Sequence, residues 1–176
     1  MNKTRDFIPE VINGFNVYKN DDRLIGVTDE ISLAEFAAMT ETVNGPGILG
    51  EYETVIIGHF GSMEQEIKFR VLDDDSFAFS NPMEVQQITL RASRQGSSRM
   101  NGNIVTSPIR IVFRGRQKSF SPGSLKQGAQ MGASVKLEVL YVLIEINGES
   151  KLELDKLNNV YMVNGVDLLA EIKAQC

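Results

Sequence analysis

Alternation of apolar and polar residues constrains the fold of this 176-residue chain more than any other feature. The alternation covers most of the sequence and is interrupted by Gly, Asn, Asp and Pro, which is typical of strands separated by turns. With 42% hydrophobic residues, the chain can bury one sizeable core, and nothing in it demands a second domain. The sequence therefore predicts a single, mainly β domain over residues 1–176.

Residues 107–120 combine this alternation with a row of positive charges. One side of the predicted strand has apolar residues and a glycine: Ile109, Ile111, Phe113 and Gly115. The other side has Val112 and four cations: Arg110, Arg114, Arg116 and Lys118. The outer face of this strand is therefore expected to be cationic.

Asn147-Gly148 predicts a β-hairpin between residues 135–146 and 149–155, because this pair tolerates the positive φ angles of a type I′ turn. A two-residue loop would place Leu143 opposite Leu152 and Tyr141 opposite Leu154. On the other face, Lys151, Glu153 and Asp155 would lie opposite an apolar row made of Leu140, Val142, Ile144 and Ile146. That row is too apolar for open solvent, so either another subunit or the chain's own helix should cover it.

Two short helices are predicted beside the strands. The first begins near residues 81–84, where an N-cap Asn is followed by Pro at the first helical position and Glu at the third. The second is C-terminal, with Asn164 as its cap and Asp167 in its first turn. Its packing residues would be Val166, Leu168, Leu169 and Ile172.

Three stretches are predicted as long connections, over residues 41–51, 95–106 and 121–132. The last two are rich in Gly, Ser, Gln and Asn. Long loops in a compact domain are usually functional or become ordered on binding, and in an assembly they would be arms that contact neighbours.

The motifs that could bind a ligand or perform chemistry are weak. Residues 45–50 match the dinucleotide pattern G-x-G-x-x-G, but a predicted strand follows where a helix should begin, so a hairpin tip is favoured. The run Asp73-Asp74-Asp75 lacks the spacing of a calcium loop and is interpreted as a solvated turn. His59 is the only histidine, which excludes a site that needs two. We expect no catalytic, cofactor or metal site and no enzyme activity.

The charges are distributed unevenly along the chain. Residues 85–137 contain nine basic side chains and no acidic one, whereas residues 1–84 hold six basic and sixteen acidic, and residues 138–176 hold three and seven. Opposite potentials on different segments suit either a polyanion or contacts between copies of the chain. Single-strand nucleic-acid binders interleave aromatic residues with their cations, whereas Phe113 and Phe120 are at core positions here, so contacts between copies are favoured.

Several segments, taken in order, resemble the major tail tube protein of contractile-tailed bacteriophages. They are FRGRQK at residues 113–118, the Gly-rich loop GSLKQG at 123–128, the long apolar strand ending at Asn147-Gly148, and MVNGVD at 162–167. The match is close over residues 109–172 and looser near the start, where FNVY at 15–18 resembles the family's first strand and residues 45–50 its glycine-rich hairpin. Residues 51–106 depart from the family.

The resemblance implies a β-barrel or sandwich flanked by one or two short helices, whose subunits close into hexameric rings that stack into a tube. It also implies sheath, baseplate and tape-measure proteins as partners, no cofactor, and passage of DNA through the lumen without specific binding. The tube would belong to a virion tail, or to a DNA-free phage-tail-like bacteriocin, and would assemble in the host cytoplasm. A nucleic-acid-binding β module that uses residues 110–118 is the alternative from another class.

Subunit contacts are therefore expected at eight candidate residues: Arg110, Arg114, Arg116, Lys118, Leu140, Val142, Ile144 and Ile146. Acidic side chains are expected to line the lumen, since basic ones would hold passing phosphates. No apolar run is long enough to span a bilayer, the first residues lack the apolar stretch of a secretory signal, and Cys176 is the only cysteine. We thus expect a protein made and kept in the cytoplasm, without a membrane anchor or an intrachain disulfide.

Overall fold

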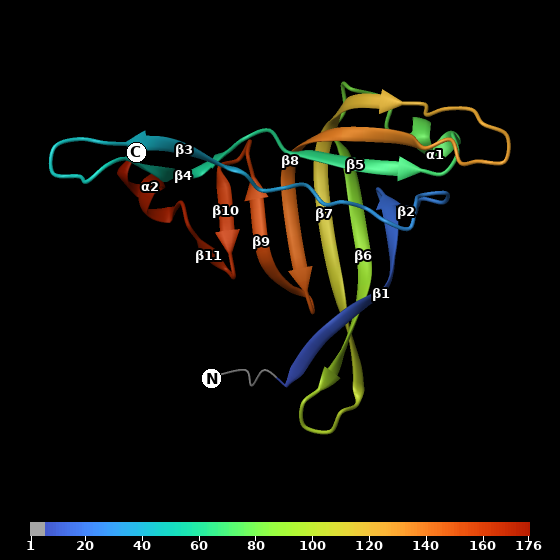
Figure 1. The fold of residues 1–176 in the computed structure, drawn as a ribbon, viewed down its shortest axis with the longest axis horizontal. Helices are drawn as coiled ribbons and strands as arrows, with labels where there is room; N and C mark the ends of the chain where they lie inside the picture. The colour runs from blue at the N-terminus through green and yellow to red at the C-terminus, as the bar shows by residue number, and fades with distance from the viewer. Residues whose placement is uncertain (1–5) are drawn as a thin grey trace.

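The computed structural model describes residues 6–176 and shows a strand-rich molecule with two short helices in this part of the chain (Figure 1). In order, the elements are β1 Phe7–Lys19, β2 Asp22–Arg23, β3 Ala38–Val43, β4 Tyr52–Phe60, β5 Glu64–Phe69, α1 Asp74–Phe77, β6 Gln86–Ser98, β7 Ile104–Ser121, β8 Ala133–Ile146, β9 Glu149–Asp155, β10 Val160–Val163, β11 Val166–Asp167 and α2 Ala170–Gln175. The expected mainly β fold with short flanking helices is confirmed.

The main sheet has the strand order β11-β10-β9-β8-β7-β6-β1-β2, and β5 pairs with the first half of β8. The chain after β2 then pairs with β5 through a Val27–Phe69 bridge, with Thr28 N–H donating to the Lys68 carbonyl over 3.0 Å and Arg70 N–H donating to Gly26 over 2.8 Å. These bonds curl one half of the sheet into a small barrel, which removes free strand edges there.

The core lies inside this barrel. Residues 29–37, which we call the strap, cross the open side of the barrel. The side-chain amide of the fully buried Gln65 holds the strap, because both its oxygen and its nitrogen form hydrogen bonds with the strap backbone. Gln65 accepts from Ala34 N–H and donates to the Ser32 carbonyl, both over 3.0 Å. The largest fully buried apolar side chains are Met63, Ile67, Phe69, Phe79, Ile88, Phe113, Val135, Leu137, Val139 and Val142.

A β-bulge at Leu140 changes which residues of β8 point inward. Arg114 pairs with Tyr141 while Gly115 pairs with Val139, so Leu140 is an extra residue that β7 does not match. Before the bulge the odd-numbered Val135, Leu137 and Val139 are buried, and after it the even-numbered Val142 is. The prediction that Leu140, Val142, Ile144 and Ile146 form one uninterrupted row is therefore wrong at Leu140.

The β8–β9 hairpin turns at Asn147-Gly148 as predicted, with φ angles of 55° and 75°. A second irregularity follows at once, because Glu145 pairs with Ser150 but Ile144 pairs with Leu152, which leaves Lys151 extra. From there the predicted register is wrong by one residue. Val142 lies opposite Leu154 rather than Glu153, and Ile144 opposite Leu152 rather than Lys151. Apolar residues thus meet apolar residues, and the chain itself covers this face.

The helices also differ from the prediction. Asp73 caps α1 through a capping box with Ser76, so the triple-aspartate run begins a helix, while Pro82 and Met83 form only a turn with the Asn81 side chain. Asn164 and Gly165, with φ angles of 50° and 80°, form the hairpin turn between β10 and β11 rather than a helix cap. The C-terminal helix α2 begins later, at Ala170.

Two projections lie at opposite ends of the long axis (Figure 1). One is the β3–β4 hairpin, whose residues 40–55 we call the arm. The register passes from Ala38–Phe60 to Thr40–Val55, so residues 56–59 bulge out of the ladder where the arm leaves the body. The other projection is the loop 121–132, one of the three predicted connections. Residues 41–51 are mainly a connection as well, because β3 ends at Val43 and β4 begins at Tyr52, and residues 45–50 are the tip of the arm, as expected. Residues 95–106 differ from the prediction, since they form the β6–β7 hairpin and only residues 99–103 lie outside its strands.

In the part of the chain that the structure describes, neither helix is long and apolar enough to cross a membrane.

Candidate subunit interface

The cations of β7 lie on the outer face of the sheet, opposite the buried Phe113, as the alternation predicts. Arg110 donates from Nη1 to the Glu145 carboxylate of β8 over 2.8 Å. Arg114 stacks on the Tyr141 ring, with its Cζ 4.2 Å from the ring centroid, and donates from Nε to Gln87 over 3.1 Å. Both arginines are therefore engaged by neighbouring strands of the same chain.

Tyr141 extends this cluster toward β9. Its hydroxyl donates to the Glu153 carboxylate over 3.1 Å. Burial, together with this hydrogen bond and the Glu153 charge, raises the pKa of Tyr141 to about 12. Arg114 and Tyr141 do place a cation beside an aromatic ring. However, the ring is stacked by Arg114 and its hydroxyl is bonded to Glu153 within the same subunit.

Lys118 lies in a network of carboxylates from β5 and β8. Its Nζ is 2.6 Å from Glu64 and 3.3 Å from Glu138. The hydrogen bond and charge of Lys118 lower the pKa of Glu64. Burial would raise the pKa of Glu138, but hydrogen bonds from Ser62, Lys118 and Met63 outweigh it and hold that pKa below its usual range. The two carboxylates in turn raise the pKa of Lys118.

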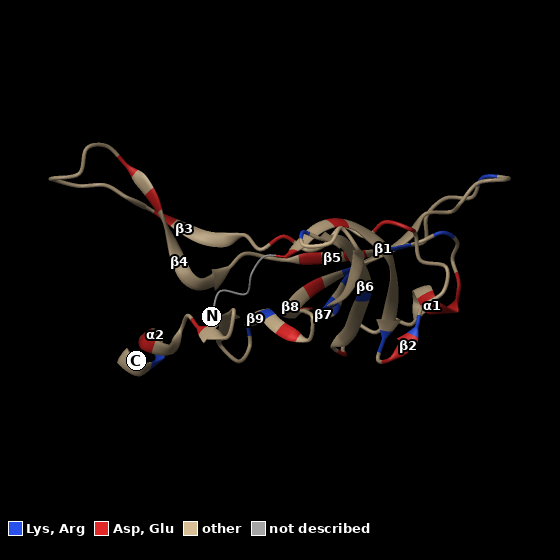
Figure 2. Cartoon of the chain, turned by 90° about the horizontal axis from the view of Figure 1, so that it is seen from below, with Lys and Arg blue, Asp and Glu red and all other residues tan. Residues whose placement is uncertain are grey.

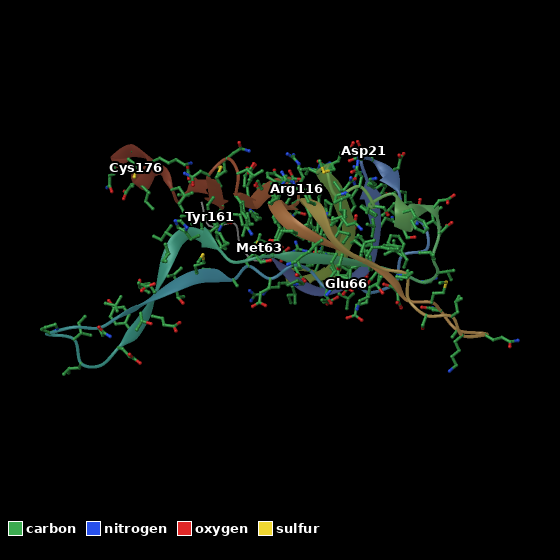
Figure 3. The ribbon with its side chains drawn as sticks, turned by 90° about the horizontal axis from the view of Figure 1, so that it is seen from above. Asp21, Met63, Glu66, Arg116, Tyr161 and Cys176 are labelled. Carbon is green, nitrogen blue, oxygen red and sulfur yellow. The ribbon has the colours of Figure 1, made fainter. Side chains whose placement is uncertain are left out.

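Arg116 differs from the other three cations. It is exposed and, although the register places it opposite Glu138 of β8, it forms no ion pair or aromatic contact within residues 6–176. Figure 3 shows it on the barrel, away from the end of the molecule where Cys176 lies. Of the four candidate cations, Arg116 is thus the one without an ion pair or a ring contact in the described chain.

The four apolar candidates are placed less favourably for subunit contact. Val142 is fully buried in the chain's own core, which leaves it no surface for a neighbour, so this candidate is wrong. Ile144 is half-buried and packs against the same core. Leu140 and Ile146 are half-buried as well. The bulge at Leu140 turns Val142 and Ile144 toward the chain's interior, and the bulge at Lys151 places Leu154 and Leu152 opposite them.

A more exposed surface, the arm, overlaps the predicted connection 41–51, but none of its residues is among the eight candidates for subunit contact. Leu49 at its tip is fully exposed, and Tyr52 and Val55 are more than half exposed. A signal for it was available, because residues 24–67 contain no Lys or Arg. Figure 2, coloured by residue type, marks acidic but no basic residues along the arm. An exposed apolar and acidic hairpin is typical of a surface that another molecule covers.

Comparison with known proteins adds three findings. Residues 9–176 match the sequence model of the family described as phage tail tube protein FII. The chain is similar to the tail tube protein of Escherichia phage P2, with 24% identity over 165 residues that span 93% of this chain and 95% of the phage protein.

The fold is similar to a chain in the cryo-EM structure of the sheath/tube terminator of an extracellular contractile injection system in its extended state. The TM-score is 0.55 with 13% identity, over 78% of this chain and 97% of the other. At this level of identity the likeness concerns the fold alone.

Proposed function

Since the chain belongs to the phage tail tube protein FII family, and is thereby a structural component of contractile phage-type tails, we propose that it closes into hexameric rings that stack into a hollow tube. The rings would form a conduit through which DNA passes without specific binding. In a complete tail the tube would contact sheath, baseplate and tape-measure proteins. We propose no catalytic role for it.

The placement of the two projections is the observation that most supports assembly. The arm and the loop 121–132 extend from opposite ends of the body and both expose large apolar side chains, among them Leu49 and Leu125. Different surfaces at opposite ends produce heterologous, head-to-tail contacts, and such contacts close into rings or continue as filaments. A monomer would leave both projections in water at a cost in solubility.

Charge supports a role for Arg116 in these contacts. It is the unpaired cation of β7, whereas the acidic arm has no basic residue to pair with. Acidic side chains would line the lumen, because each contact between a phosphate and Lys or Arg adds salt-dependent affinity for DNA.

The first test is negative-stain electron microscopy of the purified protein at high concentration. Rings or tubes would support the proposal. A protein that stays monomeric, and whose DNA affinity falls steeply with salt, would instead support a nucleic-acid-binding module. Whether the tube belongs to a phage or a DNA-free bacteriocin is decided by neighbouring genes, because only a phage needs capsid and terminase genes.

A second test replaces Arg116 with Glu. We expect tube formation to fall about tenfold or more, because like charges across an interface repel. Thermal unfolding of the subunit should change less than assembly, since Arg116 forms no ion pair within the described chain and only the repulsion from the opposite Glu138 is added. Arg99→Glu, at the exposed β6–β7 turn, is the matched control. Unchanged tube formation by Arg116→Glu would remove this residue from the interface.

A further inference from the structure

Strand β1 has one long open edge. Its other edge pairs with β6 from Phe7 to Lys19, but toward β2 only Tyr18 and Lys19 are paired, and the Val17 carbonyl accepts from Leu24 N–H. Within residues 6–176, no strand covers β1 from Phe7 to Asn16 on that side. An unprotected edge of this length is a template on which another strand can add.

A groove of about 580 Å³ runs along this edge. One wall is β1, with Ile12 and Asn16, and the other is the chain from Arg23 to Asp29. Arg23 and Arg70 both line the groove, and neither has an acidic partner within the described chain, although Asp29 also lines it. The groove therefore offers unpaired backbone groups, apolar side chains and two free cations.

The arm has the complementary properties. It bears Glu41, Glu51 and Glu53 and no basic residue, and its apolar side chains are exposed. Beyond the bulge at its base, its two strands pair only with each other. A two-stranded ribbon is marginally stable alone, so a third strand would stabilise it.

The arm cannot reach the groove of its own subunit, because β2 and the arm lie on opposite sides of the barrel (Figure 1). Any contact between them must join two copies. It would also be heterologous, since each copy would use its arm on one neighbour and its groove on another.

We propose that the arm of one subunit adds as extra strands to the open edge of β1 in a neighbouring subunit, with its glutamates facing Arg23 and Arg70. This inference rests on the proposed tube assembly and names the elements that meet in it. Backbone hydrogen bonds set the register of the added strand, apolar side chains exclude water, and charge complementarity selects the partner surface.

A charge-swap experiment tests the proposal. The arm variant is Glu41→Lys with Glu53→Lys, and the groove variant is Arg23→Glu with Arg70→Glu. Each variant alone places like charges at every contact, so its self-association should weaken about tenfold or more. In a mixture of the two, lysine arms meet glutamate grooves and the unchanged glutamate arms meet the unchanged arginine grooves. Assembly should therefore return only in the mixture.

Arg99→Glu serves as the control, since it changes an exposed charge at the β6–β7 turn, outside the arm, the groove and the loop 121–132. Unfolding midpoints show that each variant folds. The proposal is overturned if the folded variants assemble alone like the wild type, or if their mixture stays dissociated. Sedimentation of the mixture detects pairing between copies even if no tube forms. If the mixture pairs but forms no tubes, the proposed tube assembly is contradicted and the docking of the arm on β1 is supported. If each variant alone forms tubes like the wild type, the docking is contradicted and the tube assembly is supported.

Discussion

Gly115 shows, at the scale of a single residue, how closely β7 and β8 approach each other. A Cβ at this position would lie 2.3 Å from the Glu138 carbonyl oxygen and 3.3 Å from the Val139 Cα. Both are backbone atoms, which cannot move aside as a flexible side chain would. The glycine lies beside the bulge at Leu140, where the ladder changes register.

We expect Gly115→Ala to destabilise the fold by about 1–3 kcal/mol, because the two strands must separate to admit the methyl group. Chemical denaturation measures this change. Gly148→Ala is a useful comparison, since a Cβ there meets no atom within 4 Å and only its positive φ is strained. A Gly115→Ala protein as stable as the wild type would show that the strands part at no cost.

The ion pairs of Lys118 with Glu64 and Glu138 should make the free energy of unfolding depend on pH in the acidic range. The hydrogen bond and charge of Lys118 lower the pKa of Glu64 from its ordinary value of 4.5, and the pKa of Glu138 is lowered as well. A carboxyl with a lowered folded-state pKa stabilises the fold above its unfolded value and loses that contribution as pH falls through the folded value. The loss should therefore appear below about pH 4.5.

Lys118→Met tests this expectation, because it removes the cation while keeping an apolar side chain of similar length. The variant should be less stable than the wild type at about pH 6, and the difference should shrink toward about pH 3, where the carboxylates are protonated. Denaturant midpoints at the two pH values measure it. A difference that stays constant with pH would assign the effect to packing instead.

At the scale of elements, β8 depends on one extra residue. The strand buries Val135, Leu137 and Val139 in the barrel and then Val142, which an uninterrupted strand would direct to the opposite face. Leu140, which has no partner on β7, is the extra residue that shifts the inward-facing positions from odd to even numbers. Bulges of this kind set the direction of side chains on either side of them.

Deletion of Leu140 should therefore prevent folding, whereas Leu140→Ala should lower the free energy of unfolding by only about 1 kcal/mol, because Leu140 is half-buried. Without the extra residue, either the first or the second half of β8 must turn its apolar side chains outward. Circular dichroism and hydrogen exchange distinguish the two variants. A folded deletion variant would mean that the bulge can move elsewhere along the strand.

The same elements show what the sequence can and cannot predict. The strand over residues 107–120 and the turn at Asn147-Gly148 could be predicted because each depends only on residues that are close in the sequence. Asn164-Gly165 is an identical pair, yet it was interpreted as a helix cap, since Asn suits both a type I′ turn and an N-cap. Leu140 and Lys151 resemble ordinary strand residues, so their bulges emerge only from pairing. The partners of Arg110 and Lys118 depend on that pairing and were unreadable for the same reason.

At the scale of the whole molecule, the body and the arm are separable. None of the residues of the arm is fully buried, and the core lies in the barrel. Folding should thus depend on the barrel and assembly on the projections, so that a change can affect one without the other.

Replacement of residues 42–53 by Asn-Gly tests this separation. Glu41 already pairs with Thr54, so a two-residue loop can close the shortened hairpin. We expect the unfolding free energy to change by less than about 1 kcal/mol, while the protein sediments as a monomer. Tubes formed by the shortened chain would show that the arm is dispensable, and loss of folding would show that it supports the barrel.

The continuous length of β7 has a mechanical consequence. This strand of 18 residues, about 60 Å if fully extended, is hydrogen-bonded to β6 along one edge and to β8 along the other. A force directed along the strand would load many of these bonds in shear at the same moment, instead of opening them singly from one end. In a tail that drives its inner tube forward, each subunit would then move as a rigid body and pass the force to the next subunit with little deformation.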